Sequence, residues 1–468
     1  MRSSRRPPLA CALLLSTTAL CACVDLAPPY QRPPAPVSDA WPGRSEPGPG
    51  GAAAAADIGW AGVIRDDRLR QVIGLAVNAN RDLRIAVLRV HDARAQYRIR
   101  DAASRPAVSV DAGVTRASTS GVANNTAHVE LGLAAYEIDL FGRVKNTSGA
   151  ALQNYLSTNE GARAARITVV AAVAAAWLTL GADSATQRLN VATLALDAQS
   201  LALNLRMHEL GAIPALPVAQ ARSAWESARG AVAAGRATLQ QDRDALTRLV
   251  GAEVPEPWLP LAAPAADAAA LMDVPDGLPA RVLQQRPDVL AAEHQLQAAQ
   301  LEIGVARAAY FPTITLTASA GRASAGLAGL FKAGTGAWSV GPSISLPLLD
   351  GGALHAGLDS ARTQRDIALA SYEKALQAAF AEVADALAVR GTLAERLQAQ
   401  AAQVQASESA LRDADALYRH GASSYLPVLD AQRSLHAAQQ ADIALALLEQ
   451  QNRIALYQAL GGGWKESN

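Results

Sequence analysis

The spacing of apolar residues predicts a helix and then a β-hairpin early in the chain. Over Asp66–Ala103 apolar residues recur every three or four positions, which is the period of a helix with one buried face. Pro106 ends this helix. Over Val108–Val114 apolar residues occupy every second position, as in a strand with one apolar face, and a return strand follows over about Val129–Leu140. The alternation slips at Ala134-Ala135, which indicates a β-bulge.

The same succession occurs a second time, and a long helix follows each hairpin. The proline-free stretches from Arg143 to Leu210 and from Ala353 to His420 hold 68 residues each, so as helices each would span roughly 100 Å. In the second stretch apolar residues fall on alternating three- and four-residue steps, which is typical of a coiled coil. The predicted seam comprises Leu376, Phe380, Val383, Leu387, Ala394, Leu397, Ala401, Val404 and Leu411.

The two successions are copies of one unit. Residues 80–83 reappear 206 positions later as 286–289, and residues 210–218 reappear 210 positions later as 420–428. This period is far longer than that of solenoids or propellers, so we expect two quasi-equivalent parts of one closed object. The predicted organisation is a signal peptide (1–22), an extended N-terminal arm (23–65), a first repeat (66–252, hairpin about 107–140), a Pro-rich connector (253–280), a second repeat (281–462, hairpin about 312–348) and a C-terminal tail (463–468).

A glycine ends each of the two long helices. Gly211 and Gly421 occupy matching positions in the two copies, directly after the last helical turn, where glycine is the favoured residue. A second helix then returns for about 35 residues, to Gly251 in the first copy and Gly461 in the second. Each copy is therefore expected to contain a hairpin followed by a long helix pair.

The first residues are typical of a secretory signal followed by a lipid attachment site. Arg2, Arg5 and Arg6 precede an apolar run of 12 residues, which is too short to span a bilayer as a helix. The Leu-Cys-Ala-Cys sequence that follows resembles a bacterial lipobox and predicts Cys23 as the acylated first residue of a lipid-anchored protein. The alternative is an ordinary signal cleaved nearby. Because Asp25 is not directly next to Cys23, sorting to the inner or the outer membrane stays open at this point.

Four strands with one apolar face predict a membrane barrel that several chains share. An open sheet edge in lipid leaves backbone groups without hydrogen-bond partners, so a membrane sheet has to close. Four strands are too few, because about eight is the lower limit. Two chains would give about 8 strands and a filled interior, whereas three would give about 12 strands and room for a channel. Helices of roughly 100 Å would then reach far into the periplasm.

Composition excludes several other classes of function. The 42 basic and 42 acidic residues give a net charge of zero, which leaves no basic excess for a nucleic-acid partner. Half of the residues are apolar but only 4% are aromatic, which favours long packed helices over a compact enzyme core. The seven histidines show no metal-ligand spacing, and no nucleophile elbow, P-loop or dinucleotide motif is present. We therefore expect no enzyme activity, no metal and no cofactor.

Four motifs resemble those of one family. They are Glu-Ile-Asp-Leu-Phe-Gly-Arg at 137–143, Gly-Leu-Pro-Ala-Arg-Val-Leu-Gln-Gln-Arg-Pro-Asp-Val at 277–289, Ala-Arg-Ala-Ala-Tyr-Phe-Pro at 306–312 and Tyr-Leu-Pro-Val-Leu-Asp-Ala-Gln-Arg at 425–433. In this order they resemble the TolC/OprM-type outer-membrane factors of tripartite (RND-type) efflux systems, in the lipoprotein (NodT-like) branch. The resemblance covers nearly all of the mature chain.

This resemblance implies a fold, a location and partners. The implied fold is mostly α with a β membrane part, in which a homotrimer forms a 12-stranded β-barrel continued by a 12-helix periplasmic α-barrel. The implied location is the outer membrane, with outer-membrane lipid around the barrel. The implied partners are a periplasmic membrane-fusion adaptor and an inner-membrane pump. The protein would then be a passive exit duct for drugs or other small molecules.

The resemblance also assigns roles near the second glycine turn. Leu426, Asp430 and Arg433 are spaced i, i+4 and i+7, so they share one face of the returning helix. The matching positions of the family constrict the periplasmic end, so three copies would form a cation-selective gate from rings of Leu426 and Asp430, with Arg433 holding Asp430. The alternative is that Asp430 only pairs with Arg433 or caps the helix. Gly211 and Gly421 would mark the tip where adaptor hairpins dock.

Two other functions stay open from the sequence. The same fold could serve as the exit duct of a type I protein-secretion system. The long helices could instead belong to a coiled-coil envelope lipoprotein that transports nothing. The two alternating hairpins and the repeat argue against the second of these functions.

Overall fold

The computed structural model describes residues 24–38, 41, 60–260 and 280–462. The chain divides into two compact units. The hairpin unit contains the chain up to Pro34, Leu88–Glu160 and Leu290–Lys374, and the core unit contains Ala35–Val87, Gly161–Val289 and Ala375 onward. Each unit takes segments from both sequence repeats, so neither repeat forms a compact unit by itself.

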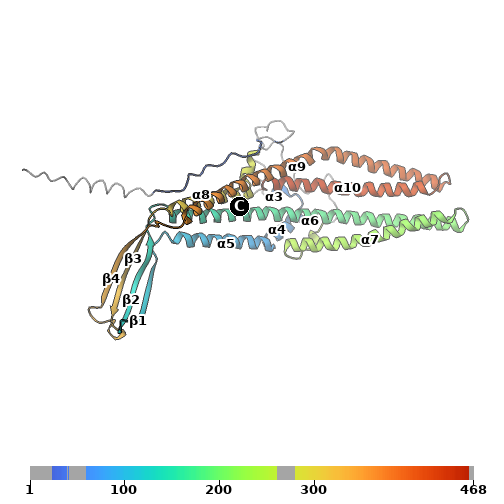
Figure 1. The fold of residues 1–468 in the computed structure, drawn as a ribbon. Helices are drawn as coiled ribbons and strands as arrows, with labels where there is room; N and C mark the ends of the chain where they lie inside the picture. Colours follow the sequence, from blue (N-terminus) through green and yellow to red (C-terminus); the bar gives the residue numbers. More distant parts are fainter. Residues whose placement is uncertain (1–23, 39–40, 42–59, 261–279, 463–468) are drawn as a thin grey trace, which may run out of the picture. The chain divides into compact units, whose positions relative to one another are not determined.

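The hairpin unit contains one antiparallel four-stranded sheet, with its strands in chain order (Figure 1). The strands are β1 (Val108–Thr119), β2 (Val122–Glu137), β3 (Thr313–Ser324) and β4 (Gly336–Ser345). The register of β2 on β3 shifts between Leu133 and Tyr136, and Ala135 has a φ of 45°. The predicted bulge at Ala134-Ala135 is therefore confirmed.

The helices of the two copies correspond in length and position. Both predicted long helices are present, as α6 (Arg143–Glu209) and α9 (Ala353–Arg419), with 67 residues each. The helices that precede the hairpins are α5 (Arg81–Ala102) and α8 (Pro287–Ala308), with 22 residues each. The remaining helices are α3 (Trp60–Val63), α4 (Asp67–Ala79), α7 (Ala215–Val250) and α10 (Leu426–Ala459), with short 3-10 turns η2 (Glu256–Trp258), η3 (Ala280–Gln285) and η4 (Leu327–Gly329).

The prediction of one helix over Asp66–Ala103 was wrong, because the chain breaks at Asn80 between α4 and α5. Asn80 has an extended conformation, with φ −62° and ψ 131°. Its Oδ1 accepts a hydrogen bond from the Leu83 N–H at 2.9 Å and so caps α5, while its Nδ2 donates to the Leu249 carbonyl at 2.6 Å. The second partner lies far away in the sequence, which is why the local helical pattern did not reveal the break.

Arg286 makes the matching contact in the second copy. Its guanidinium donates to the Ala459 carbonyl at 2.7 Å and forms ion pairs with Asp288 at 2.7 Å and Glu382 at 2.8 Å. Burial by itself would lower the pKa of Arg286, but the hydrogen bonds from Arg286 to Asp288 and Glu382 raise the pKa above its usual value. In both copies, the start of one helix is therefore tied to the carbonyl end of the returning helix.

Glycines allow these two contacts to form. Gly251 and Gly461 follow the returning helices and have φ values of 79° and 87°. A Cβ at Gly251 would lie 2.6 Å from the Ala79 carbonyl oxygen, and one at Gly461 would lie 3.2 Å from the side chain of Arg286. Both positions therefore require glycine for its backbone conformation, and Gly251 also requires it for the close approach of two backbones.

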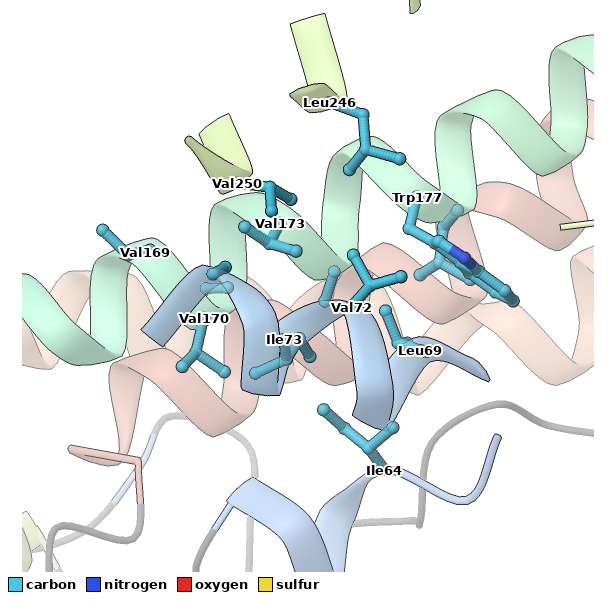
Figure 2. Close-up of a cluster of buried hydrophobic side chains, with 14 of the residues drawn as sticks. Ile64, Leu69, Val72, Ile73, Val169, Val170, Val173, Trp177, Leu246 and Val250 are labelled. Atoms are coloured by element: carbon cyan, nitrogen blue, oxygen red, sulfur yellow. The ribbon is translucent and has the colours of Figure 1, made fainter. Parts of the chain in front are cut away.

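The core unit contains a hydrophobic cluster to which α4, α6, α7 and α10 all contribute (Figure 2). Trp177 is almost fully buried in this cluster and donates its Nε1–H to the Trp258 carbonyl at 2.9 Å. The guanidinium of Arg68 lies 5.7 Å from the centre of the Trp177 ring, within the range of a cation–π contact. The residues labelled in Figure 2 are Ile64, Leu69, Val72, Ile73, Val169, Val170, Val173, Trp177, Leu246 and Val250.

The uncharged stretch within α6 belongs to this core. Among the described helices, α6 alone is long and apolar enough to cross a membrane by length and composition. However, 56% of its most apolar window is buried inside the protein, and Val173 and Leu178 are almost fully buried. The apolar stretch Ile167–Gly181 is therefore a largely buried helix segment of the core unit.

The predicted seam of α9 was only partly correct. Leu376 and Val383 are buried, but Ala394 and Ala401 are exposed. Phe380 points to a different contact, because its ring stacks on that of Trp41 with the ring centres 4.8 Å apart. The buried face keeps Leu376 and Val383 of the predicted seam but otherwise lies one position earlier, at Ala379, Ala386 and Leu393, and it begins at Tyr372.

Candidate functional site

The two helix reversals of the core unit have the same backbone geometry. The Gly211 N–H bonds to the His208 carbonyl at 2.9 Å, and the next N–H, of Ala212, bonds to the Met207 carbonyl at 2.9 Å. The second reversal repeats both bonds from Gly421 and the residue after it. This is a Schellman motif, which needs a left-handed residue after the helix, and the two glycines have φ values of 74° and 69°.

The first turns of α10 present one exposed face and one buried face. Leu426 is 50% exposed, and Asp430 and Arg433 are also exposed. Tyr425 and Val428, which alternate with them on the helix, are buried. The predicted face therefore exists, and its leucine, carboxylate and guanidinium are free to meet solvent or another copy of the chain.

The buried face of α10 packs on helices from both copies. The Tyr418 hydroxyl donates to Asn204 Oδ1 at 2.7 Å, and the Tyr418 and Tyr425 rings lie 5.3 Å apart. Burial raises the pKa of both tyrosines above its usual value, so both hydroxyls stay protonated. The cluster comprises Ala221, Tyr418, Tyr425, Val428 and Leu429, with Leu201, Met207, Ala224, Leu411 and Ala414 packed around it.

The predicted pairing of Asp430 with Arg433 is not formed. Among the residues that the structure describes, no ion pair joins the two. Arg433 instead acts on Asp197 of α6: burial raises the pKa of Asp197, and the Arg433 charge partly opposes this shift. The Arg433 charge is thus close enough to influence a carboxyl on the neighbouring helix, which the spacing along α10 does not reveal.

Sequence reasoning missed a line of buried polar residues on α6. Asn190, Asp197 and Asn204 are all buried, and they are spaced by seven residues, so they share one helix face. Near them Thr193 Oγ1 lies 3.0 Å from His436 Nδ1. Polar residues at a strict seven-residue spacing in an alanine-rich helix were the signal that could have located this contact with α10.

The register of the sheet gives it one apolar and one polar face. Val108 lies opposite Leu133 and Val110 opposite Leu131, so the apolar positions of β1 and β2 coincide. The same alternation continues across β3 and β4. The apolar face is formed by Val108, Val110, Ala112, Val114, Val129, Leu131, Leu133, Ile314, Leu316, Ala318, Ala320, Trp338, Val340, Pro342 and Ile344. The polar face carries Asp111 directly opposite Glu130.

The start of the described chain is held at the base of the first hairpin. Cys23 itself, with the predicted signal peptide, lies outside the described residues. The N–H of the next residue, Val24, bonds to the Leu140 carbonyl at 3.0 Å. Asp25 accepts hydrogen bonds from Lys145 at 2.8 Å and from Asn146 at 2.9 Å. Burial by itself would raise the pKa of Asp25, but these hydrogen bonds hold that pKa at about 2.

The described part of the chain offers no cluster of metal-ligating side chains. Within it, no group of three or more His, Cys, Asp or Glu side chains is placed to hold a metal ion. The functional features of these residues are thus the two-faced sheet, the paired helix reversals and the exposed face of α10.

Comparisons with known proteins agree with these features. The family model of the outer membrane efflux proteins matches residues 72–252 and 278–462. The chain is 44% identical over 454 residues to the antibiotic efflux pump outer membrane protein ArpC and to the toluene efflux pump outer membrane protein TtgC, both of Pseudomonas putida, covering 94% of this chain and 93% of each relative. The open-state MtrE outer membrane channel of Neisseria gonorrhoeae superposes with a TM-score of 0.81 at 35% identity, covering 94% of this chain and 99% of that one. The resemblance predicted from the sequence motifs is confirmed, and the chain belongs to the outer membrane efflux protein family.

Proposed function

We propose that three copies of this efflux channel form a passive exit duct through the outer membrane. The observation that carries the proposal is the sheet. Among the described strands, β1 and β4 are edges with no further strand beside them, and an open edge is not tolerated in lipid. Pairing of β4 with β1 of the next copy would close a barrel of about 12 strands, wide enough for a channel. The apolar face would contact lipid and the polar face would line the lumen.

The exposed face of α10 is proposed as the gate of this duct. A threefold axis next to Leu426 and Asp430 would gather three leucines and three carboxylates into two rings. An apolar ring excludes water and ions, and a carboxylate ring favours cations. The tyrosine cluster behind this face supports the proposal, because it fixes the first turns of α10 rigidly against α7 and α9.

Partners are proposed at the two helix reversals, and a lipid anchor is proposed near the N-terminus. The reversals at Gly211 and Gly421 share one backbone geometry, so they would present near-equivalent docking points to the hairpins of a periplasmic adaptor, which in turn would contact an inner-membrane pump. Acylation of Cys23 would anchor the chain beside the hairpin base, where Val24 is already held by Leu140. The mass of the mature chain should show the acyl groups on Cys23.

The proposed cargo is small apolar or amphiphilic molecules. Relatives with 44% identity carry names that refer to toluene and antibiotic efflux. No feature of the described residues favours protein secretion or a purely structural envelope role. The duct itself would add only weak selectivity, through its carboxylate rings.

Single-channel recording in planar bilayers tests the duct and its gate together. Leu426→Ala combined with Asp430→Ala should conduct more than the parent and lose its cation preference. The repeat offers a matched control, since Leu216 and Gln220 occupy the corresponding positions of the first copy. Leu216→Ala with Gln220→Ala should conduct like the parent. Absence of any channel from the parent protein would refute the duct, and equal currents from the two double variants would refute the gate.

A further inference from the structure

Charged residues of the sheet are sorted between its two faces. On the strands, Asp111 and Glu130 lie opposite one another on the polar face. Arg116 of β1 and Arg322 of β3 lie in the alternation of the apolar face, because Arg116 continues the series that ends at Val114 and Arg322 lies opposite Val129. The carboxylates therefore face one side, and the guanidinium groups face the side that would contact lipid.

The two arginines stand where the apolar band ends. Arg116 is the next residue on this face after Val114 of β1, and Arg322 is the next after Ala320 of β3, towards the β3–β4 loop. Trp338 is 79% exposed and pairs with Ala320, so it is the residue of the apolar face on β4 that lies nearest the β3–β4 loop. An exposed tryptophan near the end of an apolar band is typical of the interface between hydrocarbon and headgroups.

The β3–β4 loop adds a third cation beside Arg322. The Arg322 guanidinium donates to the Lys332 carbonyl at 3.1 Å and to Thr335 Oγ1 at 3.3 Å, so the loop folds over this arginine. Lys332 is exposed, and its neighbour Phe331 is 75% exposed. Among the described residues Arg116, Arg322 and Lys332 form no ion pair with a carboxylate of this chain, so three positive charges are available to an external anion.

We infer that Arg116, Arg322 and Lys332, the basic rim, bind the phosphate groups of a phosphorylated glycolipid in the outer leaflet of the membrane. The inference rests on the proposed function, since it takes the apolar face of the sheet to be the lipid face. A free cation at the headgroup level is attracted to anionic lipid, and Arg additionally offers a fork of N–H donors that matches a phosphate. Trp338 and Phe331 would lie among the upper acyl chains and glycerol- or sugar-level groups. The lumen-facing carboxylates would not repel the lipid, because they lie on the opposite side of the sheet.

Native mass spectrometry of the full chain, purified in detergent and titrated with bisphosphorylated lipid A, tests this inference. The triple variant Arg116→Gln, Arg322→Gln, Lys332→Gln should bind roughly a hundredfold more weakly than the parent, at about fivefold for each cation. Because Arg322 also holds the loop, a second variant keeps it: Arg116→Gln with Lys332→Gln should lose about 25-fold. The matched control on the polar face, Asp111→Asn with Glu130→Gln, should bind lipid like the parent.

Several results would overturn the basic rim. Lipid A affinity that is unchanged in both rim variants, or reduced equally in the polar-face control, would contradict the inference. So would binding of dephosphorylated lipid A as tight as that of bisphosphorylated lipid A. Full competition by millimolar inorganic phosphate would mean that free phosphate is the ligand. Planar-bilayer currents from the same preparations separate this outcome from failure of the duct. If the rim variants form normal channels and bind lipid A like the parent, the lipid-binding inference is wrong and the proposed function still holds.

Discussion

Replacing Asn80 by alanine should destabilise the protein by about 2–4 kcal/mol per chain. Two losses make up this value. Oδ1 no longer caps α5 at the Leu83 N–H, which costs about 1 kcal/mol. Nδ2 no longer donates to the Leu249 carbonyl, and a polar group left without a partner away from water costs about 1–3 kcal/mol. Asn80→Asp separates the two, since it keeps the capping oxygen but cannot donate to the carbonyl.

The second copy supplies a matched perturbation. Arg286→Met leaves the buried carbonyl of Ala459 without its donor and should also cost about 1–3 kcal/mol. The carboxylates of Asp288 and Glu382 stay 45% and 54% exposed, so water solvates them when the arginine is gone. Glu382→Gln should therefore cost less than about 1 kcal/mol, the range of an exposed ion pair. The carbonyl contact, and not the ion pair, is the larger stabilising interaction.

Thermal unfolding followed by circular dichroism of the purified full chain measures these differences. The entropy of unfolding is about 2.1 cal/mol/K per residue, so a chain of 468 residues loses about 1 °C for each kcal/mol. Asn80→Ala should lower the midpoint by about 2–4 °C at a fixed heating rate, and Glu382→Gln by less than about 1 °C. If Asn80→Ala melts within about 0.5 °C of the parent, or if Glu382→Gln costs as much as Arg286→Met, the reasoning about these contacts is wrong.

Two further predictions concern the helix tips and the pH dependence of stability. Gly421→Trp should abolish drug export by blocking adaptor docking while trimers persist, whereas Gly421→Asn, which tolerates a positive φ, should export normally; export by both variants would place docking elsewhere. Burial, with a hydrogen bond and repulsion from Asp183, raises the pKa of Asp242 to about 6. The folded state then binds the extra proton, so stability should fall as pH rises from about 4 to about 6, and Asp242→Asn should flatten this slope in melting curves.

Local sequence signals predicted where the long helices begin and end. They did not predict which face of α9 is buried. A proline-free stretch bounded by glycine defines α6 and α9 because glycine is the residue that permits the left-handed turn after them. The seam of α9 could not be placed correctly, because alanine fills many positions and fits a buried or an exposed site about equally well. Phe380 followed the expected spacing, yet its ring packs on Trp41, a residue more than 300 positions away in the sequence.

The comparison of the two copies explains why part of the site could be predicted and part could not. Two features are the same in both copies. A Schellman turn follows each long helix, and a polar side chain donates a hydrogen bond to a carbonyl at the end of each returning helix. The turns depend on glycine at a fixed place, so they can be predicted from the repeat, whereas the carbonyl contacts join residues far apart in the sequence and could not be. The side chains that differ, Gln220 in one copy and Asp430 in the other, reveal where a carboxylate ring could form. What they do not reveal is that the Arg433 charge acts on Asp197, because that effect depends on the packing of α10 on α6 and not on any spacing within α10.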